Sequence, residues 1–150
     1  MNITVSGQYD VPDLPSGTQV VLALSPTEMA EANVDLLRPD YFWLPMDDVE
    51  GDEDGDFAPS ELHLKRLTRL LYRTEATHLH IACQMGVSRS TALLAHTLAV
   101  LHPAMSDRAI ADEVLLIRPG ASPNRLVLEL SDERLERNLA AAFNTLAAYD

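Results

Sequence analysis

Short apolar runs alternate along the chain with longer segments in which apolar residues recur at helical spacing. The runs contain β-branched and aromatic residues and are bounded by glycine, proline or serine, which is typical of short buried strands. The predicted strands are 3–5, 19–23, 41–45 and 77–82.

Helix starts are marked by capping residues. Ser25 is followed by a proline and, three residues later, by Glu28, a pattern that predicts a capped helix ending before Val34. Ser60 caps a second predicted helix, with leucines on one face. The predicted helices after the first are 60–73, 88–101, 106–117 and 124–148, the last with a break near Ser131 left open.

Strands that alternate with helices indicate an α/β fold with a central, mostly parallel sheet flanked by helices. A length of 150 residues, without repeats or a long linker, predicts one domain over 1–150. Ligands of such sheets bind outside the carboxyl ends of the strands. Segment 83–89 directly follows a predicted strand, so we expect the site there.

Composition narrows the classes of partner. The net charge of −12 argues against nucleic acid and anionic membranes, which would be repelled. No apolar run approaches the roughly 18 residues that span a bilayer, and the start lacks the pattern of a signal peptide. A single cysteine suits a reducing compartment. We expect a cytoplasmic protein without nucleic-acid or membrane partners, and we expect a monomer.

The candidate chemistry lies in His80-Ile-Ala-Cys83-Gln-Met-Gly86-Val-Ser88-Arg89-Ser90-Thr91. A strand delivers Cys83 into a tight turn, Gly86 permits an unusual backbone angle, and a helix begins near Ser88. Successive N–H groups in such a turn bind anions, and the amino end of the helix adds partial positive charge. A thiol in such surroundings is typically ionised near neutral pH.

Arg89 follows Cys83 by six residues, where its guanidinium can close the turn and bind two phosphate oxygens. The Ser90 hydroxyl can donate a hydrogen bond to the sulfur. A buried structural cysteine is the alternative, and a bare Cys-x5-Arg spacing would favour it. The strand, glycine, hydroxyls and apolar helix favour a phosphate site instead. Its predicted phosphate-binding residues are Gln84, Met85, Gly86, Val87, Ser88 and Arg89.

This segment resembles the signature of the cysteine-dependent protein tyrosine phosphatases, Cys-x2-Gly-x2-Arg-Ser/Thr. The run 86–92 is similar to the dual-specificity branch and its small bacterial relatives. The resemblance covers roughly 40–130, including Asp48, which lies 35 residues before Cys83, and the Arg-Pro and Ser-Pro-Asn elements at 118–119 and 122–124. It departs at Ala82, where the family usually has histidine.

The resemblance implies a phosphatase that hydrolyses phosphate monoesters through a cysteinyl-phosphate, without metal or cofactor. Its implied substrates are phosphorylated proteins, foremost phosphotyrosine and then phosphoserine or phosphothreonine, or small phosphate esters. It favours Asp48 over Asp47 as the general acid. Residues 118–124 are expected to fix the last helix against the phosphate loop.

Two other functions remain open. Ala82 favours a phosphatase-like module that binds phosphorylated partners without turnover. Arsenate reductases and rhodanese-like proteins also use a cysteine in an anion loop, but such reductases generally need further cysteines.

Three further patterns favour ordinary surface or core roles. The acidic residues of 47–56 are interpreted mainly as a solvated loop. Segment 50–61 nearly matches a calcium-binding loop. Three features oppose a calcium site there: the glutamate at its first position, Pro59, and a strand in place of a helix before it. The histidines lack zinc-like spacing. Basic residues of the second helix predict a solvated face or, less directly, a docking patch; they are Lys65, Arg66, Arg69 and Arg73.

Overall fold

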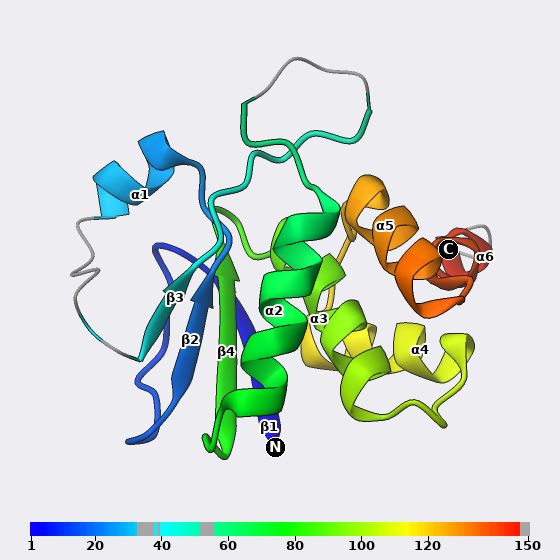
Figure 1. The fold of residues 1–150 in the computed structure, drawn as a ribbon, viewed down its shortest axis with the longest axis horizontal. Coiled ribbons are helices and arrows are strands. Elements are labelled where there is room, and N and C mark those ends of the chain that lie inside the picture. Colours follow the sequence, from blue (N-terminus) through cyan, green and yellow to red (C-terminus); the bar gives the residue numbers. More distant parts are fainter. Residues whose placement is uncertain (33–37, 39, 52–55, 148–150) are drawn as a thin grey trace.

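Four parallel strands form one sheet in a computed structural model, which describes residues 1–32, 38, 40–51 and 56–147 (Figure 1). The spatial order is β1-β4-β2-β3. Gly7 pairs with Cys83, and Ala82 lies between Ser6 and Leu22. The strands are β1 Asn2–Gly7, β2 Gln19–Leu22, β3 Tyr41–Trp43 and β4 His78–Cys83.

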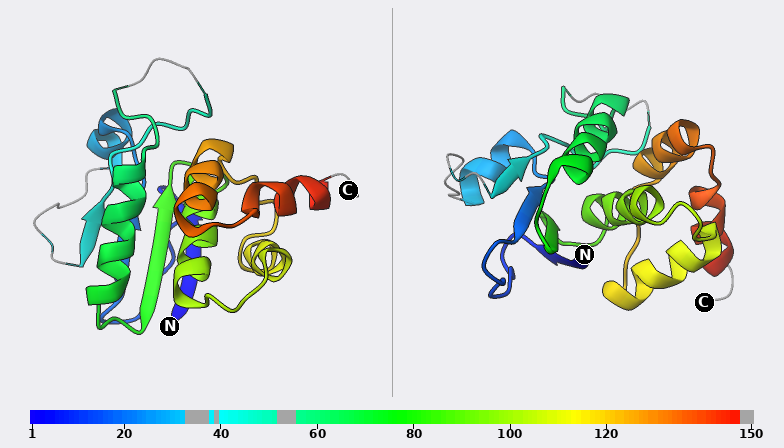
Figure 2. Two further views of the ribbon diagram at one scale, coloured as in Figure 1. Left: turned by 45° about the vertical axis from the view of Figure 1, so that its right-hand side comes forward. Right: turned by 60° about the horizontal axis from the view of Figure 1, so that its bottom comes forward.

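Helices α2 and α3 cover one face of the sheet, and α4, α5 and α6 pack beyond α3 (Figures 1 and 2). This arrangement confirms the predicted α/β class with a parallel sheet and flanking helices. Among the described residues, no helix is long and apolar enough to cross a membrane. The helices are α1 Pro26–Ala32, α2 Glu61–Arg73, α3 Arg89–Leu101, α4 Asp107–Ile117, α5 Arg125–Leu135 and α6 Leu139–Ala147.

Alternation along β4 divides its side chains between two apolar clusters. Leu79, Ile81 and Cys83 face the large core under α2 and α3. His80 and Ala82 lie on the opposite face, where Ala82 packs with Leu22 and other residues near α1.

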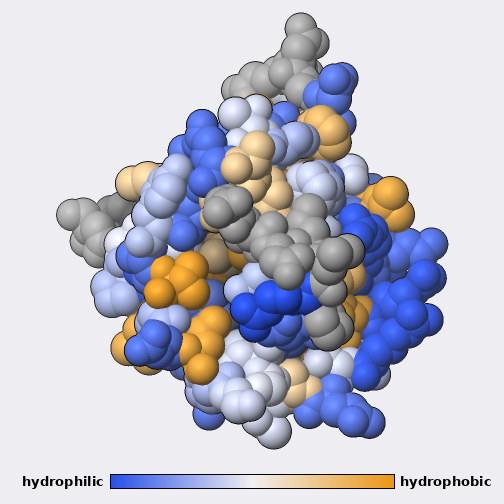
Figure 3. Space-filling view, turned by 90° about the vertical axis from the view of Figure 1, so that its left-hand side faces the viewer, coloured by the Kyte–Doolittle hydropathy of each residue, from blue (hydrophilic) through white to orange (hydrophobic). Residues whose placement is uncertain are grey.

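On the side of the molecule seen in Figure 3, most of the coloured surface is hydrophilic and its hydrophobic groups are small.

The helical region after residue 124 breaks later than predicted. α5 continues through Ser131, and the interruption lies at 136–138, where Glu136 adopts a left-handed conformation with φ 56°. The Asp132 carboxylate accepts hydrogen bonds from the backbone N–H groups of Leu139 at 2.6 Å and Ala140 at 3.1 Å. Asp132 therefore caps α6, which explains why the break comes after it. The segment is thus not one continuous helix, and the break that the sequence left open near Ser131 lies instead at 136–138. Residue 148 lies outside the described residues.

His96 is a buried polar link between three helices. His96 lies on α3, and its ring forms hydrogen bonds with Thr68 Oγ1 of α2 and Ser131 Oγ of α5, each at 2.8 Å. Burial, with a smaller effect of Arg134, lowers the pKa of His96 to about 4. The folded protein therefore holds this histidine neutral at pH values where the unfolded chain protonates it.

We expect the free energy of unfolding to fall as the pH drops from about 6.5 towards 4, because the unfolded chain then binds a proton that buried His96 does not. His96→Gln retains hydrogen-bonding groups but cannot titrate. Between pH 7 and 5, urea denaturation should show about 1–2 kcal/mol less loss of stability in this variant than in the wild type. Equal losses would show that His96 does not contribute to the acid sensitivity.

Candidate active site

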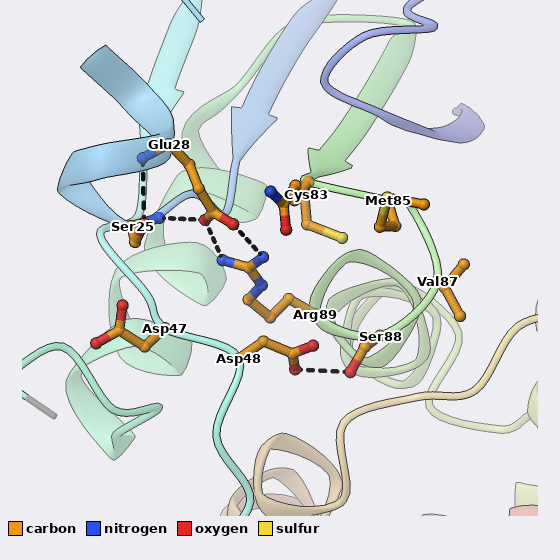
Figure 4. A pocket seen from close by; sticks show the side chains of 10 residues that line it. Ser25, Glu28, Asp47, Asp48, Cys83, Met85, Val87, Ser88 and Arg89 are labelled. Carbon is orange, nitrogen blue, oxygen red and sulfur yellow. Dashed lines mark hydrogen bonds and ion pairs between the residues drawn. The ribbon is translucent and has the colours of Figure 1, made fainter. Parts of the chain in front are cut away.

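A pocket of about 400 Å³ opens at the carboxyl edge of the sheet (Figure 4). Its walls come from the segments that follow β2, β3 and β4, as expected for a ligand site in a parallel sheet. The structure thus brings together residues that are far apart in the sequence. They are Ser25, Glu28, Asp47, Asp48, Cys83, Gln84, Met85, Val87, Ser88 and Arg89.

Cys83 ends β4 and is only 2% exposed. Its thiol donates a hydrogen bond to Ser90 Oγ at 3.2 Å, and as a thiolate the sulfur would accept one from the same hydroxyl. Gly86 has φ 71°, and a side chain there would meet Gly7 N and the Ser6 carbonyl carbon at 2.5 Å. The predicted need for glycine is confirmed by both the backbone angle and the close packing.

The backbone of the loop is held from outside. Every carbonyl from Gln84 to Ser88 accepts a hydrogen bond from beyond the loop. A peptide C=O and the N–H of the next residue point in opposite directions, so the amides that follow these carbonyls point away from the external donors. In the described part of the chain, the amides of residues 85–88 have no acceptor. The donors to the carbonyls include Gln8 N, the Arg118 guanidinium, Ser122 N and Asn124 N.

The elements at 118–124 therefore fix the loop, as the sequence predicted. Arg118 Nε and Nη2 donate to the carbonyls of Gly86 and Met85 at 3.0 and 3.1 Å. Asn124 N donates to Ser88 O at 3.0 Å while its side chain accepts from Val127 N at the start of α5. One short segment thus caps α5 and anchors the loop.

Arg89 is 3% exposed and uses one edge of its guanidinium for protein contacts (Figure 4). Nη1 donates to Glu28 Oε1 at 2.6 Å and to Met46 O at 2.7 Å, and Nη2 donates to Glu28 Oε2 at 3.0 Å. Nε is buried without a partner in the described structure. Of the five N–H bonds of the group, Nε–H and the second Nη2–H remain free. These two bonds are parallel and match two oxygens of a phosphate.

Glu28 and Arg89 form a charged pair. Burial alone would raise the pKa of Glu28, but hydrogen bonds from Arg89 and from Ser25 N outweigh it and lower that pKa. Burial would likewise lower the pKa of Arg89, and Glu28 outweighs it, so that this pKa is raised. The guanidinium is therefore already neutralised by one carboxylate before any anion enters the pocket.

Sequence reasoning identified Glu28 only as a helix cap. The cap is confirmed, because Ser25 N donates to Glu28 Oε1 at 2.8 Å and Glu28 N donates to Ser25 Oγ at 3.2 Å. The contact with Arg89 was missed. Its only sign in the sequence is the position of a capping glutamate directly after a strand, at the edge where ligands bind.

Asp48 and Asp47 both line the pocket but point differently. Asp48 lies towards Ser88, while the Asp47 side chain extends away from Cys83 (Figure 4). Asp48 Oδ1 accepts hydrogen bonds from Ser88 Oγ at 2.8 Å and Asn124 Nδ2 at 2.9 Å. Both donors meet the same oxygen, Oδ1.

Metal binding has no geometric support among the described residues, which contain no cluster of three or more histidine, cysteine, aspartate or glutamate side chains able to hold an ion. Residues 52–55 of the calcium-loop-like segment 50–61 lie outside the described residues.

Replacing Glu28 with glutamine should expose the energetic role of the pair. A buried guanidinium without its countercharge costs about 3 kcal/mol, so we expect a comparable fall in the free energy of unfolding. Added phosphate restores a countercharge and should raise the Tm of the variant more than that of the wild type. Glu31→Gln, an exposed change on the same helix, should do neither. Wild-type stability of Glu28→Gln would contradict this role for the pair.

Comparisons with known proteins identify the fold. The sequence matches no protein-family model and no curated protein. Among solved structures it is similar to human DUSP28, with 17% identity and a TM-score of 0.60 over 99% of this chain and 95% of that one. It is also similar to Tk-PTP in the active form, with 24% identity and a TM-score of 0.54 over 79% and 78% of the two chains.

A third similar structure is PTPMT1 in complex with PI(5)P, with 18% identity and a TM-score of 0.53 over 85% of this chain and 79% of that one. The three structures are phosphatases of the class that the motif at 83–90 resembles. This chain therefore has the fold of the dual-specificity-like, cysteine-dependent tyrosine phosphatases.

Proposed function

We propose that the protein hydrolyses phosphate monoesters through a cysteinyl-phosphate formed on Cys83. The observation that carries this proposal is the buried Nε of Arg89, which has no partner among the described residues and belongs to a pocket that Cys83 also lines. An unpaired buried donor is unfavourable, and a phosphate oxygen supplies its acceptor. Similarity to phosphatase structures supports phosphatase activity in general.

In the first step, the Cys83 thiolate attacks phosphorus in line with the ester oxygen. The S–P bond forms, the P–O bond breaks, and the leaving oxygen takes a proton from Asp48. Arg89 and the amides of residues 85–88 stabilise the charge on the other phosphoryl oxygens.

In the second step, water attacks the phosphorus of the cysteinyl-phosphate and gives its proton to the Asp48 carboxylate. The S–P bond breaks, inorganic phosphate leaves, and the sulfur departs as a thiolate that accepts a hydrogen bond from Ser90. Because protein groups provide the charge stabilisation, neither step needs a metal ion or cofactor.

Phosphotyrosine in proteins is the substrate that we favour, ahead of phosphoserine and phosphothreonine. Cys83 is 2% exposed, so the phosphoryl group must reach into the pocket, and an aryl ester extends further from a peptide backbone than a seryl ester. Glu28, Asp47 and Asp48 line the same pocket and disfavour substrates that carry additional phosphates. Since PTPMT1 was solved with PI(5)P, this lipid belongs in the substrate screen.

A binding module without turnover is the second candidate, and Ala82 in place of histidine favours it. Steady-state hydrolysis of p-nitrophenyl phosphate separates the two functions: turnover by the wild type supports the enzyme, and oxyanion binding without turnover supports the module.

Cys83→Ser should abolish hydrolysis, because a serine hydroxyl is a weak nucleophile that stays protonated in this loop. We expect kcat/KM for p-nitrophenyl phosphate to fall by at least about 10³-fold. Phosphate affinity, measured by calorimetry, should stay within a few-fold of the wild type because Arg89 and the loop amides remain. Hydrolysis at the wild-type rate by the serine variant would end the cysteinyl-phosphate mechanism.

Asp48→Asn should slow substrates with poor leaving groups by about 100-fold, because the departing oxygen then receives no proton from the enzyme. p-Nitrophenyl phosphate should be affected far less, since its phenolate leaves without protonation. A plot of kcat against leaving-group pKa measures the difference, and Asp47→Asn is the matched control. If Asp47→Asn alone steepens the plot, the acid is Asp47, and if neither does, the acid is another group.

A further inference from the structure

A chain of polar side chains, partly buried at Thr4 and His78 and buried at Ser6 and His80, crosses the face of β1 and β4 opposite the large core. Thr4 Oγ1 lies 2.8 Å from His78 Nε2 and 2.7 Å from His80 Nδ1. His80 Nε2 lies 2.8 Å from Ser6 Oγ, which donates to Gly7 O at 2.9 Å. His80 is fully buried and Ser6 is 3% exposed. Polar groups buried to this degree need defined partners, so the direction of each bond can be assigned.

With the Ser6 proton on the Gly7 carbonyl, the Ser6 oxygen accepts the bond from His80 Nε2–H, and this is the tautomer that we assign. Burial, with a smaller effect of His78, lowers the pKa of His80 to about 4, which leaves the ring neutral and Nδ1 an acceptor. Thr4 then donates to Nδ1 and accepts from His78 Nε2–H. The chain of bonds therefore runs from His78 to the carbonyl of Gly7.

The end of this chain supports the phosphate loop. Gln8 N donates to Gln84 O at 3.1 Å, and a side chain at Gly7 would meet that same oxygen at 2.8 Å. On the other side, a side chain at Gly86 would meet the backbone of Ser6 and Gly7 at 2.5 Å. The loop thus closes against residues 6–8 without space between them.

Position 82, where the phosphatase family usually has histidine, cannot provide this support here. Ala82 is fully buried and packs with Leu22 and Met29 on the same face as His80. An imidazole at 82 would have to displace these side chains. His80, two positions earlier on the same face, reaches Ser6 instead.

The geometry points to His80 as a positioning residue: through Ser6 it orients the end of β1 against which the phosphate loop closes, and so keeps the loop amides and Cys83 in place. This inference rests on the proposed function, because it assigns the loop to phosphate binding. Loss of the His80–Ser6 bond should weaken oxyanion binding and reduce the reactivity of the thiol, without removing any group that contacts the substrate.

Two substitutions of His80 separate the bonds that it makes. In His80→Gln, the side-chain amide reaches the position of Nε2 and keeps a donor for Ser6. In His80→Asn, the shorter side chain ends near the position of Nδ1, so it keeps a partner for Thr4 but none for Ser6. We expect His80→Asn to lower phosphate affinity and the rate of Cys83 alkylation by iodoacetate at pH 7 by about tenfold, the effect of one buried hydrogen bond. His80→Gln should stay within about threefold of the wild type.

Ser6→Ala and Thr4→Val complete the test. Ser6→Ala keeps His80 and should lower phosphate affinity and the alkylation rate as much as His80→Asn does. This second variant decides the question if His80→Asn does not fold. Thr4→Val removes both bonds of the Thr4 hydroxyl, to His78 Nε2 and to His80 Nδ1, but keeps the bond between His80 and Ser6. It should lower Tm while leaving alkylation and phosphate affinity near wild-type values. If Thr4→Val lowers phosphate affinity and the alkylation rate as much as Ser6→Ala does, His80 has only a general structural role and the inference is overturned. The inference is also overturned if Ser6→Ala binds phosphate and alkylates as the wild type does.

Neither readout requires turnover. If the wild type binds phosphate but hydrolyses nothing, the proposed function fails while the ratios of alkylation rates still decide the role of His80. If the wild type is active and Ser6→Ala alkylates at the same rate, only the role of His80 fails.

Discussion

The buried ion pair between Arg89 and Glu28 is the interaction on which the arrangement of the pocket depends. Burial of a guanidinium without a countercharge costs several kcal/mol, so the start of α3 is stable in this place only with α1 beside it. Arg89 also donates to Met46 O after β3, and the pair thereby joins the segments that follow β2, β3 and β4. Because Glu28 occupies one edge of the guanidinium, it also determines which edge faces an anion.

The proposed phosphate site does not depend on net positive charge. The chain carries a net charge of −12, the pocket is lined by three carboxylates, and its arginine is already paired. In the proposed site, N–H groups take the place of net charge. They are the loop amides that follow carbonyls bonded elsewhere, and the Nε/Nη2 edge of Arg89, whose Nε has no partner among the described residues. Such donors favour the geometry of one phosphoryl group and give little attraction at a distance, which suits a monoester better than a polyanion.

Local patterns in the sequence predicted much of this molecule. The strands, the caps at Ser25 and Ser60, and the loop at 83–89 were found because each depends on neighbours in sequence. Partners distant in the chain could not be found in this way. The Glu28–Arg89 pair spans 61 residues and the Ser6–His80 bond spans 74. The pattern of apolar and polar residues along the chain indicates neither contact. The break before α6 was misplaced for a similar reason, since it depends on the bonds of Asp132 to Leu139 and Ala140.

A crystal structure of the wild-type protein with vanadate tests the central claim most directly, because vanadate mimics the phosphoryl group in transfer. We predict vanadium bonded to Cys83 Sγ, with two vanadate oxygens on Arg89 Nε and Nη2 and the others on amides of residues 85–88. Glu28 should remain paired with the adjacent Nη1/Nη2 edge of Arg89. Vanadate bound away from Cys83, or bound only after displacing Glu28 from Arg89, would contradict this account of the pocket.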